Sequence, residues 1–385
     1  MKTRLFTPGP TPVPEPVMLR MAQPIIHHRT DEFRAVIRRV SDNLSYLFCT
    51  AQPVLTLTSS GTGAMEAAIV NTMSAGEELL FVNGGKFGER WGEIARAYGL
   101  TTHELAVPWG TAATPQQILE MVAQHPAVRA VCLTHSETST GVFTDVQAIA
   151  RALRQQGYEG LVMVDGITAV GAHEMRFDDW GLDVVVTGSQ KGLMIPPGLA
   201  FIALSQRAWE FNKTSTLPKF YFNLAEARAS LEADDTPWTP AITLMLGLDE
   251  ALQMIRHEGV ENVWARHARL AAALRAGALT LGLQLFASPS SNAVTSITLP
   301  ENGSTFMKLL KEKYRVTVAA GQESLKGKIF RVSHLGYYDE ADMLSILFAI
   351  ESALTDVGHQ HSEGGGLAAA QKVFNQPHTA PGEPT

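Results

Sequence analysis

The sequence predicts an α/β protein in which a mainly parallel sheet is flanked by helices and followed by a smaller C-terminal α+β domain. Two observations lead to this prediction. Short apolar runs alternate with amphipathic stretches up to about residue 250, which is typical of a parallel sheet covered by helices on both faces. The 385 residues are 45% hydrophobic and 18% charged, so the chain can bury a large core.

The N-terminal part of the chain predicts an extended arm and then a helix. Residues 1–16 contain five prolines, so we expect an arm without a regular element. Apolar side chains recur at helical spacing over residues 31–48, and Thr30 precedes them as a candidate N-cap.

The next segments alternate between the two patterns and build the large domain, which we place at residues 17–250. Strands are predicted for "PVLTLTSSG", "ELLFVNGG", "AVRAVCLTHS", "GLVMVDGI", "LDVVVTGS" and "LAFIALS", and helices for "GAMEAAIVNTM", "RWGEIARAYG" and "VQAIARALRQQG".

The pattern changes in the C-terminal third, where we expect the smaller domain at residues 251–358. Long helices are predicted at 243–257 and 261–281, and strands around 294–299 and 329–333. Residues 359–385 are rich in Gly, Pro and polar side chains, so we expect a disordered tail.

Composition argues against several classes of protein. The formal charge of −7 and the pI near 6.0 give no basic surplus for a nucleic-acid partner. No run approaches the roughly 18 apolar residues of a membrane span, and the start lacks the apolar stretch of a secretory signal. We therefore expect a cytoplasmic protein. Cys49 and Cys132 lack metal-ligand spacing and are predicted to be inert core thiols, with no metal site.

Polar residues follow the predicted strands, and in a parallel sheet ligands bind at the carboxyl ends of the strands. Four groups stand out: "SSGTGA" at 59–64, "NGGKFG" at 83–88, "THSETSTG" at 134–141 with "VDGITA" at 164–169, and "GSQKG" at 188–192.

The first group, Gly61-Thr62-Gly63, joins a strand to a helix. Free backbone N–H groups at a helix N-terminus bind anions, so phosphate is the expected ligand, although tight packing alone also explains such a turn. The turn is not a P-loop, because no Lys-Ser/Thr follows, and Glu66 replaces the third glycine of a dinucleotide fingerprint.

Asp165 and Lys191 end two successive predicted strands. A buried carboxylate needs a partner, which is either a helix end or ion pair, or the protonated nitrogen of a heterocycle. Lys191 would lie on the same sheet edge, and Phe87 between glycines either stacks on a flat ring or simply packs. An anion turn, a carboxylate, an aromatic plate and a lysine together describe a site for pyridoxal 5′-phosphate, whose aldehyde forms a Schiff base with a lysine.

Seven motifs make the sequence resemble the class V aminotransferases of fold type I, specifically the alanine-glyoxylate, serine-glyoxylate and serine-pyruvate group. The resemblance runs from about residue 5 to 355 and leaves the C-terminal tail uncovered. It is carried by "TPGPTPVP", "SSGTGAMEA", "NGGKFGER", "HSETSTG", "VDGITAVG", "GSQKGLMIPPGLA" and "GKIFRVSHLG".

The resemblance implies roles for residues around the cofactor ring. Lys191 would form the Schiff base and, once freed, move a proton between the substrate Cα and the cofactor. Asp165 would pair with the pyridine nitrogen, Thr138 would lie beside the ring, and Phe87 would stack on it where eukaryotic relatives more often have tryptophan.

It also implies phosphate and substrate contacts. Thr62, Gly63 and Ala64 match the phosphate turn, where some relatives have His in place of Ala64, and Gln190 matches a further phosphate contact. Thr236 and Thr239 match residues that reach the phosphate from a neighbouring subunit, although relatives often have Tyr in place of Thr236. Gly9 and Arg331 match substrate-binding positions, and Arg331 would hold the substrate α-carboxylate with its planar guanidinium.

The implied function is transfer of an amino group from a small amino acid, alanine or serine, to glyoxylate or pyruvate, in a homodimer with active sites at the interface. A second possibility is another class V enzyme, a lyase or cysteine desulfurase. Neither Cys49, near a helix end, nor Cys132, inside a strand, suits the mobile nucleophile of a desulfurase.

Two further alternatives stay open. A non-catalytic subunit of a redox complex is one, although a chain without a cysteine cluster cannot itself hold an iron–sulfur centre. A dinucleotide-dependent oxidoreductase is the other, but it rests on the glycine turn alone and leaves Lys191 unexplained.

The donor and acceptor pair is not fixed by these motifs. His27, His28 and Arg29 lie in a segment that in relatives enters the partner's active site. They indicate either a preference for an acidic or phosphorylated substrate or a cluster at the subunit interface.

Overall fold

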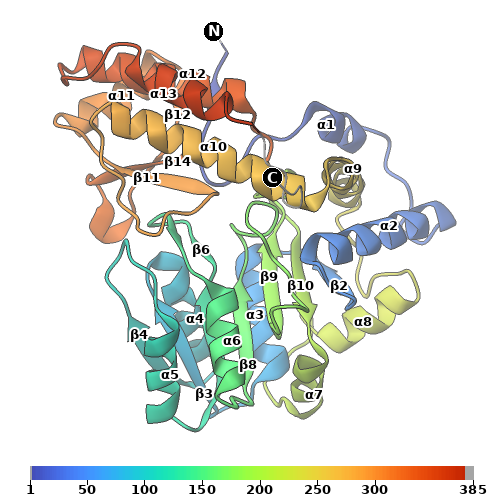
Figure 1. Ribbon diagram of the computed structural model, residues 1–385. Coiled ribbons are helices and arrows are strands. Elements are labelled where there is room, and N and C mark those ends of the chain that lie inside the picture. Colours follow the sequence, from blue (N-terminus) through green and yellow to red (C-terminus); the bar gives the residue numbers. More distant parts are fainter. Residues whose placement is uncertain (1, 378–385) are drawn as a thin grey trace.

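A seven-stranded sheet lies at the centre of the larger part of the molecule in the computed structural model, which describes residues 2–377 (Figure 1). Its strands, in spatial order, are β2 (Val54–Leu57), β10 (Ala200–Leu204), β9 (Val184–Gly188), β8 (Leu161–Asp165), β5 (Val128–Thr134), β3 (Glu78–Asn83) and β4 (Thr101–Ala106). Only β10 runs antiparallel to its neighbours, and the remaining pairs are parallel. The predicted mainly parallel α/β fold is therefore confirmed.

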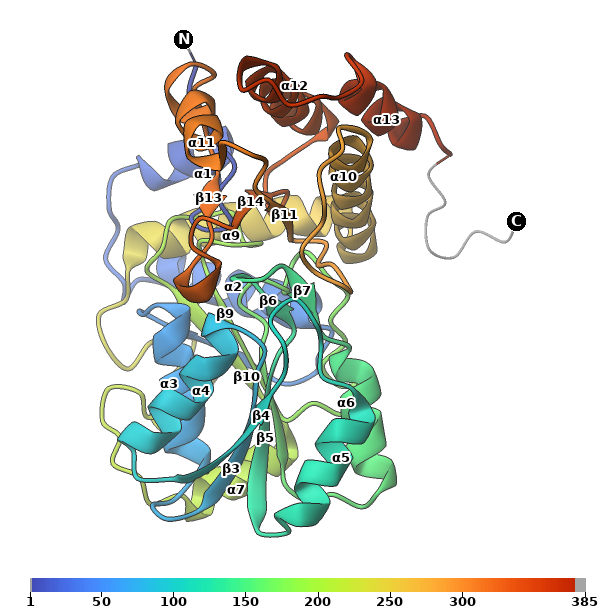
Figure 2. The same cartoon turned by 90° about the vertical axis from the view of Figure 1, so that its left-hand side faces the viewer.

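Helices cover both faces of this sheet. Figure 2 shows α3 (Gly61–Thr72) and α4 (Lys86–Ala97) on one face and α5 (Pro115–Gln124) and α6 (Val146–Gln155) on the other. Successive strand residues point to opposite faces, so Phe81 packs in the α3 and α4 core while Val82 packs in the α6 core. Each face is thus a closed apolar layer, and only the strand ends are left for polar chemistry.

The predicted helix at residues 31–48 is α2 (Asp31–Phe48), and its cap is the predicted one. Thr30 Oγ1 accepts a hydrogen bond from Phe33 N at 3.3 Å. The helix packs against α9 (Ile242–Glu258), and α7 (Gln206–Thr214) and α8 (Leu224–Glu232) complete the helices of this part of the molecule.

The smaller part lies above the carboxyl edge of the sheet in Figure 1. An antiparallel sheet of β11 (Val294–Thr298), β14 (Ile329–Ser333) and β13 (Ala319–Ala320) forms its floor. Its other elements are α10 (Val260–Thr280), α11 (Gly303–Glu312), β12 (Val316–Thr317), a 3₁₀ turn (Glu323–Leu325) and α12 (Glu340–Asp356). Phe306, Phe330 and Ile346 are fully buried between the sheet and the helices.

The N-terminal arm is more regular than expected. Residues 4–5 form β1 (Arg4–Leu5), which pairs in parallel with β12, and α1 (Glu15–Met21) already begins inside the predicted arm. Ser333 N donates to the Phe6 carbonyl oxygen at 2.9 Å. Strand pairing fixes the arm to the smaller part of the molecule because its backbone groups find partners there.

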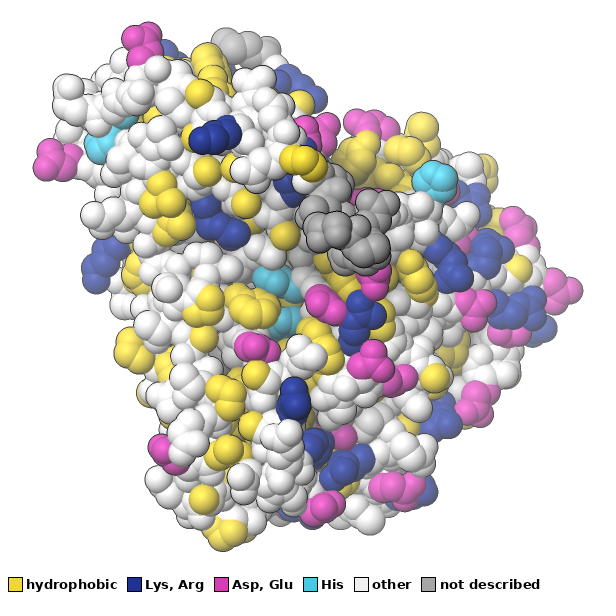
Figure 3. Space-filling model, viewed as in Figure 1, with side chains coloured by type: hydrophobic (Ala, Val, Ile, Leu, Met, Phe, Trp, Pro, Cys, Tyr) yellow, Lys and Arg dark blue, Asp and Glu magenta, His cyan; other side chains and the backbone are white. Residues whose placement is uncertain are grey.

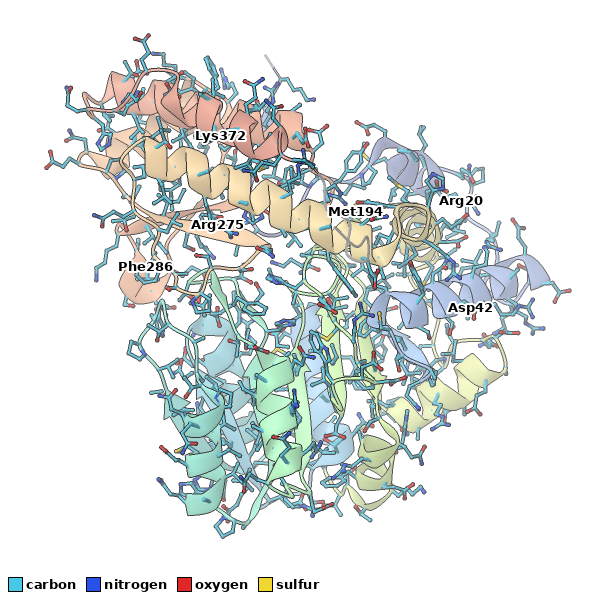
Figure 4. All side chains as sticks on the ribbon, viewed as in Figure 1. Arg20, Asp42, Met194, Arg275, Phe286 and Lys372 are labelled. Carbon is cyan, nitrogen blue, oxygen red and sulfur yellow. The ribbon has the colours of Figure 1, made fainter. Side chains whose placement is uncertain are left out.

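The prediction of a disordered tail at residues 359–385 is wrong for most of the described part of this segment. Residues 365–374 form α13 (Gly365–Phe374), which lies along α10 in Figure 4, where Lys372 marks it. Apolar side chains at helical spacing, including Ala370 and Phe374, join the core of α10 and α12 and stabilise the helix. The rest of the predicted tail, residues 378–385, lies outside the described residues.

The surface carries mixed charge. On the face shown in Figure 3, Lys and Arg side chains are interspersed with Asp and Glu rather than gathered in one basic area. None of the helices within residues 2–377 is long and apolar enough to cross a membrane.

Candidate active site

The polar strand ends predicted to form a site converge at one edge of the sheet. Strands β3, β5, β8 and β9 lie side by side in the sheet in this order and run parallel. Their carboxyl ends therefore point the same way. Asp165 is the last residue of β8, and the segments that follow β3, β5 and β9 carry Phe87, Thr138 and Lys191. This edge faces β14 and the N-terminal arm.

Lys191 is buried, with 8% of its surface exposed. Its Nζ donates a hydrogen bond to the Pro8 carbonyl oxygen of the arm. Thr11 Oγ1 donates to the Lys191 carbonyl oxygen at 3.2 Å, so the arm holds both ends of this residue. Burial lowers the pKa of the Lys191 ammonium from 10.5 to about 8, while the nearby Asp165 carboxylate opposes the shift. About a tenth of the amine is therefore neutral and nucleophilic at pH 7, far more than for a lysine with the ordinary pKa of 10.5.

Asp165 ends β8 beside the strand that leads to Lys191. Its Oδ1 accepts a hydrogen bond from Ile167 N at 2.8 Å, and no side chain within the described chain forms an ion pair with it. Burial raises the pKa of this carboxyl to about 7, and the Ile167 N–H opposes the rise. A carboxyl of this kind would gain most from a cationic partner placed against its free oxygen.

The turn before α3 has unused donors. Gly63 N and Ala64 N donate to the Ser60 carbonyl oxygen, at 2.9 and 3.3 Å, and no side chain caps the helix. Gly61 N and Thr62 N have no acceptor within residues 2–377. Free N–H groups at a helix N-terminus suit a phosphate.

Gln190 extends the same turn. Its Oε1 is buried without a hydrogen-bond partner, and a Cβ on Gly188 would lie 3.1 Å from this oxygen and 3.6 Å from Gly61 N. Rotation of the amide by half a turn would present the Nε2 donors instead. An unpaired buried amide beside an uncapped helix indicates a missing polar ligand.

Phe87 lies in the first turn of α4, and two residues that the sequence analysis missed surround it. Glu137 accepts hydrogen bonds from Phe87 N at 3.1 Å and from Gly88 N at 2.9 Å. The Arg90 guanidinium lies 4.9 Å from the centroid of the Phe87 ring, and its Nη1 donates to Thr62 Oγ1 at 3.1 Å. Arg90 therefore joins the aromatic plate to the anion turn.

Both missed residues stand inside motifs that were noticed, Glu137 in "HSETSTG" and Arg90 in "NGGKFGER". In both motifs, the feature that could have indicated a functional residue is a charged side chain among small and polar residues that follow a strand. Nothing in the linear pattern showed which groups each would contact.

Arg331 lies in the middle of β14 and is 5% exposed. Its Nε and Nη2 donate to the Ala320 carbonyl oxygen at 3.1 and 2.8 Å, and its Nη1 donates to the Thr138 carbonyl oxygen at 2.8 Å. Guanidinium has five N–H donors, so one on each terminal nitrogen stays without a protein acceptor in the described structure. Burial lowers the pKa of Arg331 to about 10, so it stays cationic at neutral pH.

Thr138 and Gly9 also lie at this edge. Thr138 Oγ1 is 2.6 Å from Thr168 Oγ1, and Thr138 itself is buried. Gly9 has φ of +150°, and a Cβ there would collide with the end of the Lys191 side chain. The structure thus brings together Gly9, Thr62, Gly63, Ala64, Phe87, Thr138, Asp165, Gln190, Lys191 and Arg331 at one edge of the sheet.

Thr236 and Thr239 are not joined to this group by any hydrogen bond among the described residues. They lie in the loop between α8 and α9, where Thr236 Oγ1 donates to the Trp238 carbonyl oxygen at 2.8 Å. Arg29 forms an ion pair with Asp235 at 2.5 Å in the same loop. Part of the positive charge predicted for this segment is therefore neutralised within the chain.

The residues present fit pyridoxal 5′-phosphate. The uncapped turn of α3 and Gln190 suit its phosphate, Asp165 suits its ring nitrogen, Phe87 suits its flat face, and Lys191 suits its aldehyde. The fold and this edge together define a pyridoxal 5′-phosphate enzyme of fold type I.

Comparisons with known proteins identify the family. The family profile described as "Aminotransferase class-V" matches residues 4–347. A "Soluble hydrogenase, small subunit" of Synechococcus sp. (strain PCC 6716) is 44% identical over 382 residues, which are 97% of this chain and 99% of the relative. A serine–glyoxylate aminotransferase of Hyphomicrobium methylovorum is 35% identical over 382 residues, 97% of this chain and 94% of the relative.

A solved structure agrees with these matches. The ureidoglycine-glyoxylate aminotransferase from Bacillus subtilis superposes with a TM-score of 0.92 at 28% identity, over 98% of this chain and 99% of that one. The chain belongs to the class V aminotransferase family, and the protein is a pyridoxal 5′-phosphate-dependent aminotransferase.

Proposed function

We propose that this aminotransferase moves the amino group of a small neutral amino acid, alanine or serine, to glyoxylate or pyruvate. The observation that carries the proposal is the pair of unused N–H groups on Arg331, which faces the same edge as Lys191 and Asp165. This pair suits one carboxylate, the group that every amino acid and 2-oxo acid has in common.

Pyridoxal 5′-phosphate, when bound, supplies an aldehyde for the amino group and a ring that draws electrons from the substrate Cα. Lys191 has a pKa near 8 and moves a proton at that Cα, because its amine exists in both protonation states near neutral pH. Asp165 keeps a proton on the ring nitrogen, and Arg331 orients the carboxylate so that the Cα proton faces Lys191.

The donor is proposed to be neutral because the described chain supplies few free cations beyond Arg331. Arg90 is directed to Thr62 and the Phe87 ring, and Arg29 is paired with Asp235. The names of the serine–glyoxylate and ureidoglycine–glyoxylate relatives support glyoxylate as an acceptor.

The active unit is proposed to be a homodimer in which Thr236 and Thr239 reach the phosphate of the partner. Support comes from the surface beside them, where Phe220 is 77% and Tyr221 45% exposed. The rings of Phe220 and Trp238 lie 5.1 Å apart, so the loop stands next to an exposed aromatic patch. The cytoplasmic location expected from the N-terminal sequence stays a prediction.

The redox-complex alternative rests on the names of two relatives, soluble hydrogenase subunits of Synechococcus sp. (strain PCC 6716) and Anabaena cylindrica. Within residues 2–377 no group of three or more His, Cys, Asp or Glu side chains is arranged to hold a metal ion, so the structure adds no site in its favour. The desulfurase alternative is no stronger, because Cys132 is buried in β5 and burial raises the pKa of its thiol.

A donor and acceptor panel tests the proposed function. Purified enzyme is given L-alanine, L-serine or L-aspartate, each with glyoxylate or pyruvate, and the new amino acid is quantified. We expect kcat/KM for alanine or serine to exceed that for aspartate at least about tenfold, because the described residues of the site offer few free cations beyond Arg331 for a second carboxylate. Lys191→Ala is the inactive control. Equal or better turnover of aspartate would contradict the neutral donor.

A further inference from the structure

Glu137 is a buried carboxylate at the centre of the site whose purpose is not explained by the roles proposed above. It ends the short strand β6 (Ser136–Glu137) and is 3% exposed. Each of its oxygens accepts two hydrogen bonds. Oε2 takes Phe87 N and Gly88 N at 3.1 and 2.9 Å, and Oε1 takes Ser139 N and Oγ at 3.0 and 2.6 Å.

These contacts hold the N-terminus of α4 from outside the helix. Lys86 N donates to Ser139 Oγ at 3.0 Å, so the first three N–H groups of α4 are all bonded to side chains of residues 137 and 139. A Cβ on Gly85 would collide with Glu137 Cγ and Cδ, so the carboxylate is packed directly against this turn. The turn of α3, in contrast, has no side-chain cap.

The N-termini of α4 and α3 therefore differ in how their positive ends are neutralised. The positive end of α4 is neutralised by the protein's own carboxylate, and the positive end of α3 is left for an external anion. Glu137 also constrains Phe87, because the backbone N–H of Phe87 donates to its carboxylate. Glu137 fixes where this ring stands relative to the sheet edge.

The same segment also reaches the substrate side. Thr138, the residue after Glu137, accepts a hydrogen bond from Arg331 Nη1 through its carbonyl oxygen at 2.8 Å. Phe87 and Arg331 are thus both attached to residues 137–138, although they come from α4 and β14.

We propose that Glu137 is a positioning residue of this enzyme, which places Phe87 against the cofactor ring by holding the first turn of α4. The inference rests on the proposed function and on the fit of the Phe87 ring to the flat face of the cofactor. Glu137 does not touch the reacting atoms, and it acts through the backbone of α4.

The test compares Glu137→Ala with Asp183→Ala in the full-length protein. Asp183 serves as the control because it is also 3% exposed and accepts from Val162 N and Ser205 Oγ, both at 2.8 Å. It also forms an ion pair with Arg154, and it precedes β9 at the opposite edge of the sheet. Two quantities are measured: the dissociation constant of pyridoxal 5′-phosphate and the visible circular dichroism of the bound cofactor. Thermal unfolding is recorded for each variant.

We expect Glu137→Ala to weaken cofactor binding about tenfold and to reduce the visible dichroism, because a ring free to shift stacks poorly. Asp183→Ala should lower the melting temperature while leaving both cofactor readouts near wild type. If Glu137→Ala does not fold, Glu137→Gln replaces it, because glutamine keeps the side-chain volume. We expect the same loss of cofactor binding and dichroism, since the glutamine NH₂ would face backbone N–H donors. Equal cofactor effects of the Glu137 and Asp183 variants would overturn the proposal.

A double-mutant cycle with Phe87→Leu separates this inference from the proposed function. If Glu137 acts through Phe87, Glu137→Ala adds less than about twofold in the Phe87→Leu background, because the interaction is already lost. A full tenfold effect in that background would refute the positioning role while leaving the stacking intact. If Phe87→Leu alone changed neither readout, the stacking itself would be wrong, and this inference with it.

Discussion

Burial changes the protonation of two side chains at the sheet edge. The pKa of Asp165 rises to about 7 and that of Lys191 falls to about 8, in both cases mainly because the charged form loses hydration. Such shifts oppose folding of the cofactor-free chain and favour a bound cation at Asp165 and a reactive amine at Lys191. The burial of these two groups therefore lowers the stability of the apoprotein, and a bound cofactor that pairs with Asp165 would offset this loss.

Asp165→Asn should stabilise the apoprotein and weaken cofactor binding. Because the folded-state pKa is raised from 3.8 to about 7, the wild-type carboxyl contributes stability at low pH that is lost as pH rises through this window. Asn keeps the acceptor for Ile167 N and removes the charge. Denaturant unfolding should show a gain of at least about 1 kcal/mol at pH 8 and a smaller gain at pH 5. The same gain at both pH values would show that Asp165 is not the titrating group.

Arg331→Lys should lower kcat/KM for donor and acceptor at least tenfold, or about 1.4 kcal/mol. An ammonium keeps the charge but cannot bond Ala320 and Thr138 and still present two parallel donors. Steady-state kinetics on both half-reactions measures the effect.

Arg275→Lys is the matched control for this change. Arg275 lies on α10, as Figure 4 shows, and donates to the Ser291 carbonyl oxygen at 3.0 Å, so its loss should affect stability more than kinetics. A normal kcat/KM for Arg331→Lys with a lowered melting temperature would remove Arg331 from the site.

Sequence reasoning located the site residues that stand at the ends of strongly apolar strands. Lys191 and Asp165 were recognisable because a charge after a buried strand requires an explanation. Glu137 and Arg90 were missed because their partners, Phe87 N and Thr62 Oγ1, are brought near only by folding. The unused donors of Gly61 and Thr62 likewise depend on whether another side chain caps α3, which no local pattern records.

Elements with a strong period were predicted well, and elements that depend on tertiary contacts were not. The helix α2 and the buried strands β8 and β9 follow the predicted ranges because their apolar spacing is unambiguous. β4 was missed because this edge strand is largely exposed and reads "TTHELA". α13 was mistaken for a disordered tail because glycine, proline and polar residues surround its short apolar stripe.

Phe374→Ala should destabilise the smaller part of the molecule by about 3 kcal/mol, because the ring is 8% exposed and packs in the core beneath α13. Phe348→Ala is the control, since Phe348 on α12 is 57% exposed and should change stability little. Thermal unfolding of both variants checks this. Equal melting temperatures would show that α13 adds nothing to the core.

At the scale of the whole molecule, the residues proposed to bind the substrate and those proposed to bind the cofactor lie on different parts of the fold. Lys191, Asp165 and Phe87 belong to the seven-stranded sheet and its helices, while Arg331 belongs to the three-stranded sheet above it. The N-terminal arm contacts both, through Phe6 at β14 and Pro8 at Lys191. A shift between the two parts would therefore change the distance between Arg331 and Lys191.

The proposed dimer predicts that the aromatic patch beside Thr236 is an interface. Phe220→Asp should shift the protein toward monomer in sedimentation and weaken cofactor binding, because a buried charge opposes association and the partner's threonines are lost. Phe348→Asp, on the exposed face of α12, should leave both unchanged. A fully active, cofactor-bound monomer of the Phe220 variant would refute the shared site.

The identity of the lysine that binds the cofactor decides whether this sheet edge is the active site. Borohydride treatment of the holoenzyme fixes the cofactor to its lysine, and peptide mapping by mass spectrometry then finds the labelled residue. We expect one label, on Lys191, and no label in Lys191→Ala. A label on another lysine, or none in a protein that still transfers amino groups, would contradict the assignment of this site.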